Sequence, residues 1–223
     1  MAISLDFHEK VAQITFDDGK ANAINPDWMT ELTAALDEAE GRAGAIVLAG
    51  RHGIFSGGFD LKWLATNGLE KSGELLDQAS RLLVRIYGGP KPVVAACTGH
   101  AIAMGAFLLL ACDTRIAATG DFRFGANETV NNMILPAFGI ALPRARLDNR
   151  RLVSAIIQAE LFAPEDALAI GYVDRLVAQE AVVPMALEAA ARLAALPGAA
   201  YAANKRKLHQ GTIDEIEAAI GSY

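Results

Sequence analysis

Cysteine is scarce in this sequence. Only Cys97 and Cys112 occur among 223 residues, and neither belongs to a C-x-x-C pair or to a cluster with histidine. A disulfide framework needs more cysteines, and a structural zinc site needs clustered ligands. We therefore expect both thiols to be buried apolar groups, and we expect no metal site.

Positive charge is also in short supply. Lysine and arginine number 20 against 26 aspartates and glutamates, which gives a net charge of −6. A basic excess is the usual footprint of nucleic-acid binding, so nucleic acid is not an expected partner. The segment Met1–Asp6 has neither the basic flank nor the apolar run of a secretory signal, and we expect a cytoplasmic protein.

Long apolar runs are rare as well. The stretch Val93–Cys112 is nearly uncharged and long enough to cross a bilayer. However, Thr98, His100 and Gly105 interrupt it, and a Lys91-Pro92 break precedes it. The pattern favours a buried strand, a tight loop and a buried helix, and we expect no membrane association.

Hydrophobic residues are plentiful overall. They make up 52% of the chain, enough to fill the core of one large domain or of one domain with a small appendage. Apolar runs and amphipathic stretches predict repeated strand–strand–helix units followed by helices, an α/β architecture with a helical C-terminal segment. The expected strands are 3–16 (a hairpin), 45–49, 93–97, 114–118 and 121–124; the expected helices are 26–40, from 61 onward, 73–87, 105–112, 143–158, 164–169 and 182–205.

Two loops share one design, in which a strand runs into a glycine-containing turn and then a helix. They are Ile54–Leu61 and Thr98–Gly105. The first N–H groups of a helix lack intrahelical partners, and the helix dipole adds positive charge there. Two such ends converging on one carbonyl oxygen form an oxyanion hole. Glycine turns before helices are also common as purely structural features, so the two loops alone leave both interpretations open.

Ordered motifs narrow the choice. Phe55–Lys62 resembles the F-[SAC]-[AG]-G-x-D-L motif of the crotonase (enoyl-CoA hydratase/isomerase) family. Gly99–Asp113 is similar to that family's second loop and helix, G-x-A-x-G-G-G-x-x-L-x-x-x-C-D. Lys20–Asn25 resembles the segment that cradles the adenine end of coenzyme A, and Phe124–Thr129 and Ala163–Asp174 match in order.

The resemblance runs from about residue 3 to 208. It implies a crotonase-like (ClpP/crotonase) spiral of strand–strand–helix units that binds acyl-CoA, with coenzyme A entering as the substrate thioester and no separate cofactor. By position in the motifs, the oxyanion donors are the backbone N–H groups of Phe59 and Met104. Ala103 and Met104 stand where relatives carry glycine, so the donor at Met104 depends on the loop keeping its shape. The expected substrate-binding residues are Ala21, Ala23, Ile24, Ser56, Gly57, Gly58, Asp60, Leu61, Lys62, Phe107 and Asn127.

Two positions bear on the reaction. Hydratases of this family use two glutamates, since one group must activate water and another must deliver a proton. Here the first position is Phe107, which cannot activate water, and the second is Glu128. A single carboxylate suits the transfer of a proton from C2 to C4 of a 3-enoyl thioester. Phe107 and Met104 are expected to keep the pocket dry and to raise the pKa of Glu128.

The segments Gly125–Thr129 and Leu161–Glu165 resemble most closely the mitochondrial-type Δ3,Δ2-enoyl-CoA isomerases, which also carry an apolar residue at the position of Phe107. We therefore predict conversion of 3-enoyl-CoA to 2-enoyl-CoA, with Glu128 as the base. The alternatives are an enoyl-CoA hydratase or another crotonase-type lyase or hydrolase, and a non-catalytic acyl-CoA-binding protein. Nothing pairs His100 with a nucleophile, and Ser56 lies outside any G-x-S-x-G elbow.

Polar residues near the loops have simpler explanations. Asp60 and Asp113 each follow a motif loop and are expected to accept hydrogen bonds from backbone donors. Lys62 either meets a phosphate of coenzyme A or is a solvated helix residue. We divide the chain into an acyl-CoA-binding core, residues 1–190, and a shortened C-terminal helical segment, residues 191–223. By the resemblance, we expect a homotrimer or a dimer of trimers.

Overall fold

Nine strands form two sheets in the computed structural model, which describes residues 3–223 apart from the side chain of Leu69. The larger sheet has the order β1-β2-β3-β5-β7-β9, and the smaller has the order β4-β6-β8. The large-sheet strands are β1 (Ile3–His8), β2 (Val11–Phe16), β3 (Ala45–Ala49), β5 (Val93–Cys97), β7 (Thr114–Ala118) and β9 (Arg175–Val177). The small-sheet strands are β4 (Gly53–Ser56), β6 (Gly99–Ile102) and β8 (Phe124–Gly125).

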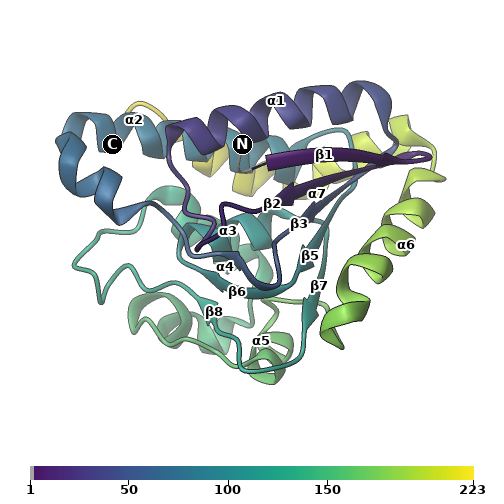
Figure 1. Cartoon of the computed structure of the whole chain (residues 1–223). Helices are drawn as coiled ribbons and strands as arrows, with labels where there is room; N and C mark the ends of the chain where they lie inside the picture. Colours follow the sequence, from purple (N-terminus) through teal and green to yellow (C-terminus); the bar gives the residue numbers. More distant parts are fainter. Residues whose placement is uncertain (1–2) are drawn as a thin grey trace.

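The chain winds between the two sheets in a repeated pattern (Figure 1). A strand of the large sheet leads to a strand of the small sheet and then to a helix, as in β3–β4–α2, β5–β6–α3 and β7–β8–α4. Apart from the β1–β2 hairpin, the paired strands of both sheets run parallel. These strand–strand–helix units and the hairpin confirm the predicted architecture. The helices are α1 (Pro26–Arg42), α2 (Leu61–Gly88), α3 (Met104–Ala111), α4 (Ala137–Arg146), α5 (Pro164–Ile170), α6 (Val182–Ala194) and α7 (Gly198–Ala218).

The central strands are apolar on both faces because both faces are covered. In β3, Ile46 and Leu48 belong to the main core, whereas Val47 and Ala49 belong to a second cluster beneath α6. Side chains alternate between the two faces of a strand, so the run needs apolar residues at every position. Helices α1 and α6 accordingly lie on opposite faces of the large sheet (Figure 1).

Asn25 fixes the start of α1. Its side-chain oxygen accepts a hydrogen bond from the backbone N–H of Trp28, Pro26 occupies the first turn and Asp27 lies near the positive end of the helix. The helix buries a stripe against the sheet that includes Leu32 and Leu36. These features confirm the predicted helix start.

Several predicted boundaries were wrong. Strands β4 and β6 replace predicted loops, and β8 begins at Phe124 rather than at 121. The strands β4 and β6 approach so closely that a Cβ on Gly99 would lie 2.0 Å from the carbonyl carbon of Gly53. Glycine, which disfavours strands in general, is required here by that contact.

The predicted helix 143–158 was also wrong. Helix α4 begins at Ala137 and contains Pro143 in its interior, and the chain continues as a 3₁₀ turn (Asn149–Arg151) and a π turn (Val153–Ile157). Phe138 and Leu142 are fully buried, so their packing outweighs the cost of the proline.

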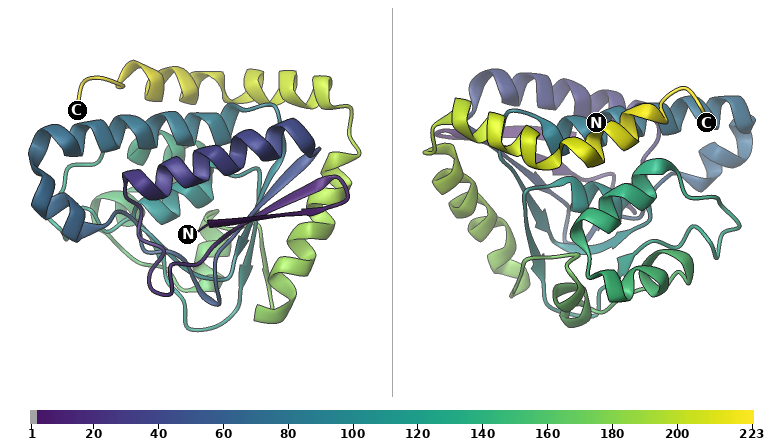
Figure 2. Two further views of the ribbon diagram at one scale, coloured as in Figure 1. Left: turned by 45° about the horizontal axis from the view of Figure 1, so that its top comes forward. Right: turned by 180° about the vertical axis from the view of Figure 1, so that it is seen from behind.

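The predicted helix 182–205 is two helices. Pro197 separates α6 from α7, and the two axes meet at 105°. Helix α7 turns back across the molecule and packs on α2 and α4 (Figure 2). The predicted domain boundary at residue 190 falls inside α6, while the change in direction occurs at 195–197.

The helices were also compared with the length and composition of a membrane span. Within residues 3–223, no single helix combines the length and apolar composition needed to cross a bilayer; Gln179–Ala194 and Gly198–Ala218 meet the criterion only when taken together. The run Val93–Cys112 forms β5, β6 and α3; the buried strand and the buried helix agree with the prediction, whereas β6 replaces the predicted tight loop.

The connection into β9 is fixed by an ion pair. The Arg115 side chain is 6% exposed, and Asp174 accepts hydrogen bonds from its backbone N–H (2.7 Å) and from Nε (3.0 Å). We predict that Asp174→Asn lowers the free energy of unfolding by about 2 kcal/mol, because the half-exposed carboxylate compensates a buried guanidinium. Urea denaturation measures the change; Asp121→Asn, at a 91% exposed ion-pair carboxylate, is the control and should have little effect.

Candidate active site

The first glycine turn pairs with the segment 21–24. Gly57 N donates to Ala21 O (2.8 Å), Ile24 N donates to Gly58 O (2.8 Å), and Asp60 N donates to Ile24 O (2.9 Å). This ladder holds the turn between β4 and α2, in which Gly58 adopts a φ of 93°. The backbone N–H of Phe59 donates to no other residue within 3–223, so it remains available to a ligand.

Ser56 and Asp60 shape this turn. The Ser56 side chain is fully buried; its hydroxyl donates to Asn22 O (2.8 Å) and accepts from Gly58 N (3.2 Å). Asp60 caps α2 by accepting from the N–H groups of Lys62 and Trp63, which confirms its predicted structural role. The structure thus places the side chains of Ser56 and Ile24, both 0% exposed, behind the turn.

The second turn has Ala103 and Met104 at positions where the family motif has glycines. Ala103 has φ 53° and ψ −126°, a conformation that favours glycine. Its N–H donates to Gly125 O (2.9 Å), and its carbonyl accepts from Ala106 N (2.9 Å). Met104 then begins α3, and its N–H likewise has no acceptor within residues 3–223. The surrounding contacts therefore hold Ala103 in a strained conformation, at a cost of about 1–3 kcal/mol.

The two turns touch each other. A Cβ on Gly58 would lie 2.7 Å from the Ala103 Cβ and 3.2 Å from the Met104 nitrogen. Gly58 directly precedes Phe59, so both predicted donors, Phe59 N–H and Met104 N–H, are carried by the contacting turns. Two unpartnered N–H groups beside a helix N-terminus can bind and stabilise an anionic oxygen.

Glu128 follows β8 and enters the interior. Its side chain is 6% exposed, and its Oε2 has no hydrogen-bond partner within the described chain. Burial raises the pKa of Glu128 to about 6, although hydrogen bonds from the backbone N–H groups of Glu128 and Asn127 oppose the shift. The predicted rise in this pKa agrees with the structure, and a carboxylate that titrates near neutral pH suits a general base.

Phe107 and Met104, the residues predicted to keep the pocket dry, are both buried. Phe107 is 1% exposed and packs edge-on against Phe138, with ring centroids 5.5 Å apart. Gly139 leaves room for the Phe107 ring, since a Cβ there would lie 3.3 Å from Phe107 Cζ and 3.0 Å from Leu135 Cδ2. Met104 is fully buried. The position that would carry a second carboxylate is therefore filled by a phenyl ring.

A groove beside the first turn gathers many of the predicted binding residues. It has a volume of about 620 Å³ and is open to solvent. The predicted residues that line it are Ala21, Ala23, Gly57, Phe59, Asp60, Leu61 and Lys62. Glu128, Met104, Phe107, Asn127, Ser56, Gly58 and Ile24 lie outside its lining. Lys62 is exposed on α2 at this groove, where an extended anionic ligand can reach it.

Tyr172 is a residue that sequence reasoning did not single out. It is fully buried, its ring lies 6.0 Å from that of Phe162, and its hydroxyl has no partner within residues 3–223. Burial and the charge of Glu128 raise its pKa. The sequence places Tyr172 in a G-Y-V-D run, 44 positions after Glu128, and nothing in that run marks its proximity to Glu128.

The α/β spiral, the two contacting turns and the buried glutamate are the features that the sequence motifs predicted. The family model for enoyl-CoA hydratase/isomerase matches residues 6–221. The chain therefore belongs to the enoyl-CoA hydratase/isomerase family, as the sequence motifs predicted.

Three relatives illustrate the family's range. A probable enoyl-CoA hydratase from Rhodobacter capsulatus is 35% identical over 98% of this chain and 85% of its own length. Human mitochondrial enoyl-CoA delta isomerase 1 is 29% identical over 92% of this chain and 70% of its own.

The third is a Mycobacterium tuberculosis protein whose two structures bear different names. As probable enoyl-CoA hydratase EchA3 it is 39% identical, with a TM-score of 0.94 over 99% of this chain and 93% of that one. As an apo enoyl-CoA isomerase it is 39% identical, with a TM-score of 0.93 over 98% and 96%. The likenesses confirm the fold, while the names divide between two activities.

Gly105 sets the distance between α3 and β4. A Cβ there would lie 2.4 Å from Ser56 O, so Gly105→Ala must push the helix start away from the strand. We predict a loss of about 1–3 kcal/mol in the free energy of unfolding and displacement of the Met104 N–H. Urea denaturation measures the first effect. Gly211→Ala, in α7 with no atom within 4 Å of the added Cβ, is the matched control and should not destabilise the protein.

Glu128 also affects stability as a function of pH. Because its pKa rises from 4.5 to about 6 on folding, the folded state holds the proton more tightly, and stability falls as pH rises through that interval. We predict that Glu128→Gln removes this loss and is more stable than the parent at pH 7 by about 2 kcal/mol. Urea denaturation from pH 4 to pH 8 tests this; parallel curves for the two proteins would contradict the burial of an ionised Glu128.

Proposed function

We propose that this chain isomerises 3-enoyl-CoA to 2-enoyl-CoA with Glu128 as its only acid–base group. One observation supports the proposal: Glu128 is a buried carboxylate whose pKa is raised to about 6, while a buried Phe107 stands where the hydratase motif has its other glutamate. Coenzyme A enters as part of the substrate, and the reaction calls for no separate cofactor.

The proposed reaction begins at the two unpartnered N–H groups. The thioester oxygen accepts hydrogen bonds from Phe59 N–H and Met104 N–H, which increases the acidity of the C2 protons. Glu128 removes a proton from C2, and the electron pair delocalises over C2, C4 and the thioester oxygen as a dienolate. The two N–H groups stabilise the charge on that oxygen, and loss of one such donor typically costs about 3–4 kcal/mol.

Return of the proton completes the reaction. The protonated Glu128 delivers its proton to C4, the double bond moves from C3–C4 to C2–C3, and the carboxylate is regenerated. No atom is gained or lost by the substrate. The fully buried Met104 and Phe107 are proposed to exclude water, which would otherwise add to the conjugated product.

Lys62 and the groove are proposed to hold coenzyme A. The groove is lined by backbone and small side chains at Ala21, Ala23 and Gly57, which admit a flat ring close to the chain. Lys62 is the exposed cation nearest the start of α2 and is proposed to meet a phosphate. The remaining acyl part then lies toward Met104 and Phe107.

Hydration is the second candidate, because the Rhodobacter capsulatus relative is named a probable hydratase. A hydratase needs one group to activate water and another to protonate carbon. Glu128 is here the only carboxylate at the two positions concerned. Parallel assays with matched 2-enoyl and 3-enoyl thioesters separate the two activities: faster loss of the 2-enoyl substrate than conversion of the 3-enoyl substrate would favour hydration.

We predict that Glu128→Gln lowers kcat for the isomerisation by about 10³-fold while leaving the binding of acyl-CoA intact, because a positioned base typically contributes that much. In the parent enzyme kcat should rise with pH through about 6 as Glu128 ionises. Glu165→Gln, an isosteric change at an exposed glutamate of α5, is the control and should change neither value. Equal, measurable activity of Glu128→Gln and the parent would refute Glu128 as the base, and binding of acyl-CoA without conversion by either protein would leave only a non-catalytic binding role.

The assembly is a separate proposal. We propose a homotrimer or a dimer of trimers in which a neighbouring subunit helps to close the acyl pocket. Sedimentation analysis combined with activity measurement tests this. A monomer with full activity would refute closure by a neighbour without affecting the proposed reaction.

A further inference from the structure

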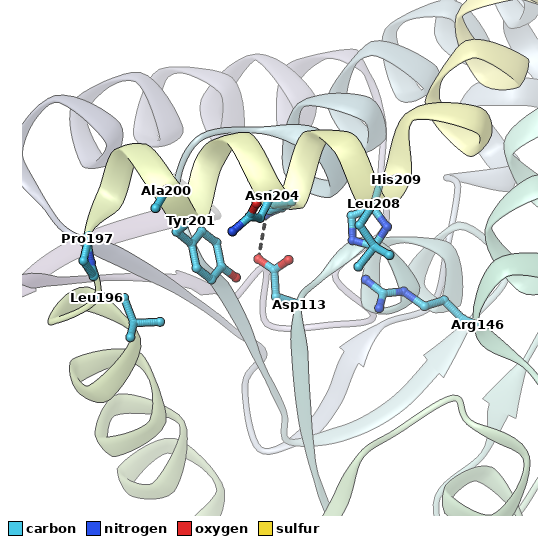
Figure 3. Close-up of a pocket in the computed structure, with 10 residues that line it drawn as sticks. Asp113, Arg146, Leu196, Pro197, Ala200, Tyr201, Asn204, Leu208 and His209 are labelled. Atoms are coloured by element: carbon cyan, nitrogen blue, oxygen red, sulfur yellow. Dashed lines mark hydrogen bonds and ion pairs between the residues drawn. The ribbon is translucent and has the colours of Figure 1, made fainter.

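A second cavity lies beneath the N-terminal half of α7 (Figure 3). Its volume is about 450 Å³, within the range of small-molecule sites. The lining comes from the α6–α7 junction, one face of α7, Asp113 after α3, and Arg146 at the end of α4. It shares no residue with the groove proposed for coenzyme A.

The charges around this cavity do not balance. Lys205 Nζ lies 2.6 Å from Asp113 Oδ2, with both side chains buried, and Arg115 is paired with Asp174. Arg146 has no carboxylate within salt-bridge distance among residues 3–223. One positive charge is therefore in excess. An uncompensated charge withdrawn from water is costly unless an anion accompanies it.

Arg146 is held in place with one nitrogen to spare. Its Nε donates to Leu110 O (3.2 Å) and its Nη2 to Cys112 O (3.1 Å), so it caps the end of α3. The guanidinium lies 4.9 Å from the centroid of the Tyr87 ring. Nη1 donates to no acceptor within the described chain, and Figure 3 shows the guanidinium turned toward the cavity near His209.

His209 is the second polar group without a hydrogen bond. It is 9% exposed and stacks on Tyr87, with ring centroids 3.9 Å apart, and neither ring nitrogen bonds to another residue within 3–223. Burial, Arg146 and Lys205 lower the pKa of His209 to about 4, so the ring is neutral at pH 7. It can donate one hydrogen bond without adding to the charge.

The mouth of the cavity is apolar. Leu196 in the α6–α7 junction and Leu208 on α7 are 48% and 79% exposed, and Ala200 of α7 also lines the cavity. Large apolar side chains at a solvent-facing rim favour a ligand with a hydrocarbon portion. Arg146 and His209 inside the cavity and the apolar rim together match a molecule with one anionic head and an aliphatic tail.

We propose that this cavity is a binding site for an aliphatic monocarboxylate. The carboxylate accepts hydrogen bonds from Arg146 Nη1 and from the His209 ring, and the tail packs against Leu196, Ala200 and Leu208. A single excess positive charge suits a monoanion, whereas a phosphate dianion would leave the cavity with a net negative charge.

Hexanoate is the probe, with hexanamide as the uncharged isostere and inorganic phosphate as the anion without a tail. The readout is the imidazole signal of His209 in proton NMR, which is local to this cavity even if hexanoate also enters the proposed acyl pocket. The chain has only four histidines, and His209→Asn assigns the signal. We expect hexanoate to shift the signal saturably and to raise the pKa of His209, because a nearby negative charge favours the imidazolium.

A matched pair of variants tests the charge. Leu208 is 79% exposed, so Leu208→Glu and Leu208→Gln should both fold. The glutamate places a like charge at the mouth, and we expect it to weaken hexanoate binding about tenfold relative to the glutamine variant. Arg146→Gln should abolish binding; urea denaturation shows whether the loss of its cap on α3 has unfolded the protein, in which case the Leu208 pair decides.

Three results would overturn the proposal. They are an unchanged His209 signal in hexanoate, equal binding of hexanamide and hexanoate, and equal affinity of the two Leu208 variants for hexanoate. A change of oligomeric state in Leu208→Glu, without any effect of hexanoate on the parent, would instead assign the cavity to contacts between copies of this chain.

Discussion

The contact between the two glycine turns determines the rest of the site. Gly58 approaches Ala103 so closely that no side chain fits at position 58, and this approach is what brings the Phe59 and Met104 donors to neighbouring positions. The turns reach each other because β4 and β6 pair at backbone contact distance through Gly99. The small sheet is therefore a scaffold whose spacing positions two N–H groups, and the large sheet supports it.

The same region gathers several locally unfavourable features. Glu128 buries an oxygen without a partner, Tyr172 buries an unpartnered hydroxyl, and Ala103 occupies a strained backbone conformation. Each costs about 1–3 kcal/mol in isolation. By contrast, the carboxylates of Asp113 and Asp174 pair with Lys205 and Arg115. Free energy of folding is thus given up around the residues to which the proposed reaction assigns the anionic oxygen and the proton transfer, a common trade between stability and function.

Sequence reasoning succeeded where short-range chemistry decides the structure. The cap at Asn25 and Pro26 fixed the start of α1, and the uniformly apolar β3 indicated a strand covered on both faces. It failed where tertiary contacts override local preference. From the sequence, Pro143 is expected at a helix start. It lies inside α4 instead, because the preceding turn packs in the core through the buried Phe138 and Leu142. Strands β4 and β6 are only four residues long and each begins with glycine, so their sequences give a weak strand signal; pairing with each other and with β8 defines them.

The predicted site divides in the same way. Motif spacing named Phe59, Met104 and Glu128; the structure places Phe59 and Met104 on the contacting turns and buries Glu128. Motif spacing could not distinguish Ser56, whose side chain faces away from the groove, from Gly57, which lines it. It also could not find Tyr172, which is 44 positions from Glu128 and approaches it only after β8 and the turn at Gly171 are in place. Arg146 also could not be singled out from the sequence. It is the last residue of α4 and caps the C-terminal end of α3, so the second cavity adjoins the helix that begins at Met104. Long-range packing, rather than residue type, decides which polar groups become neighbours here.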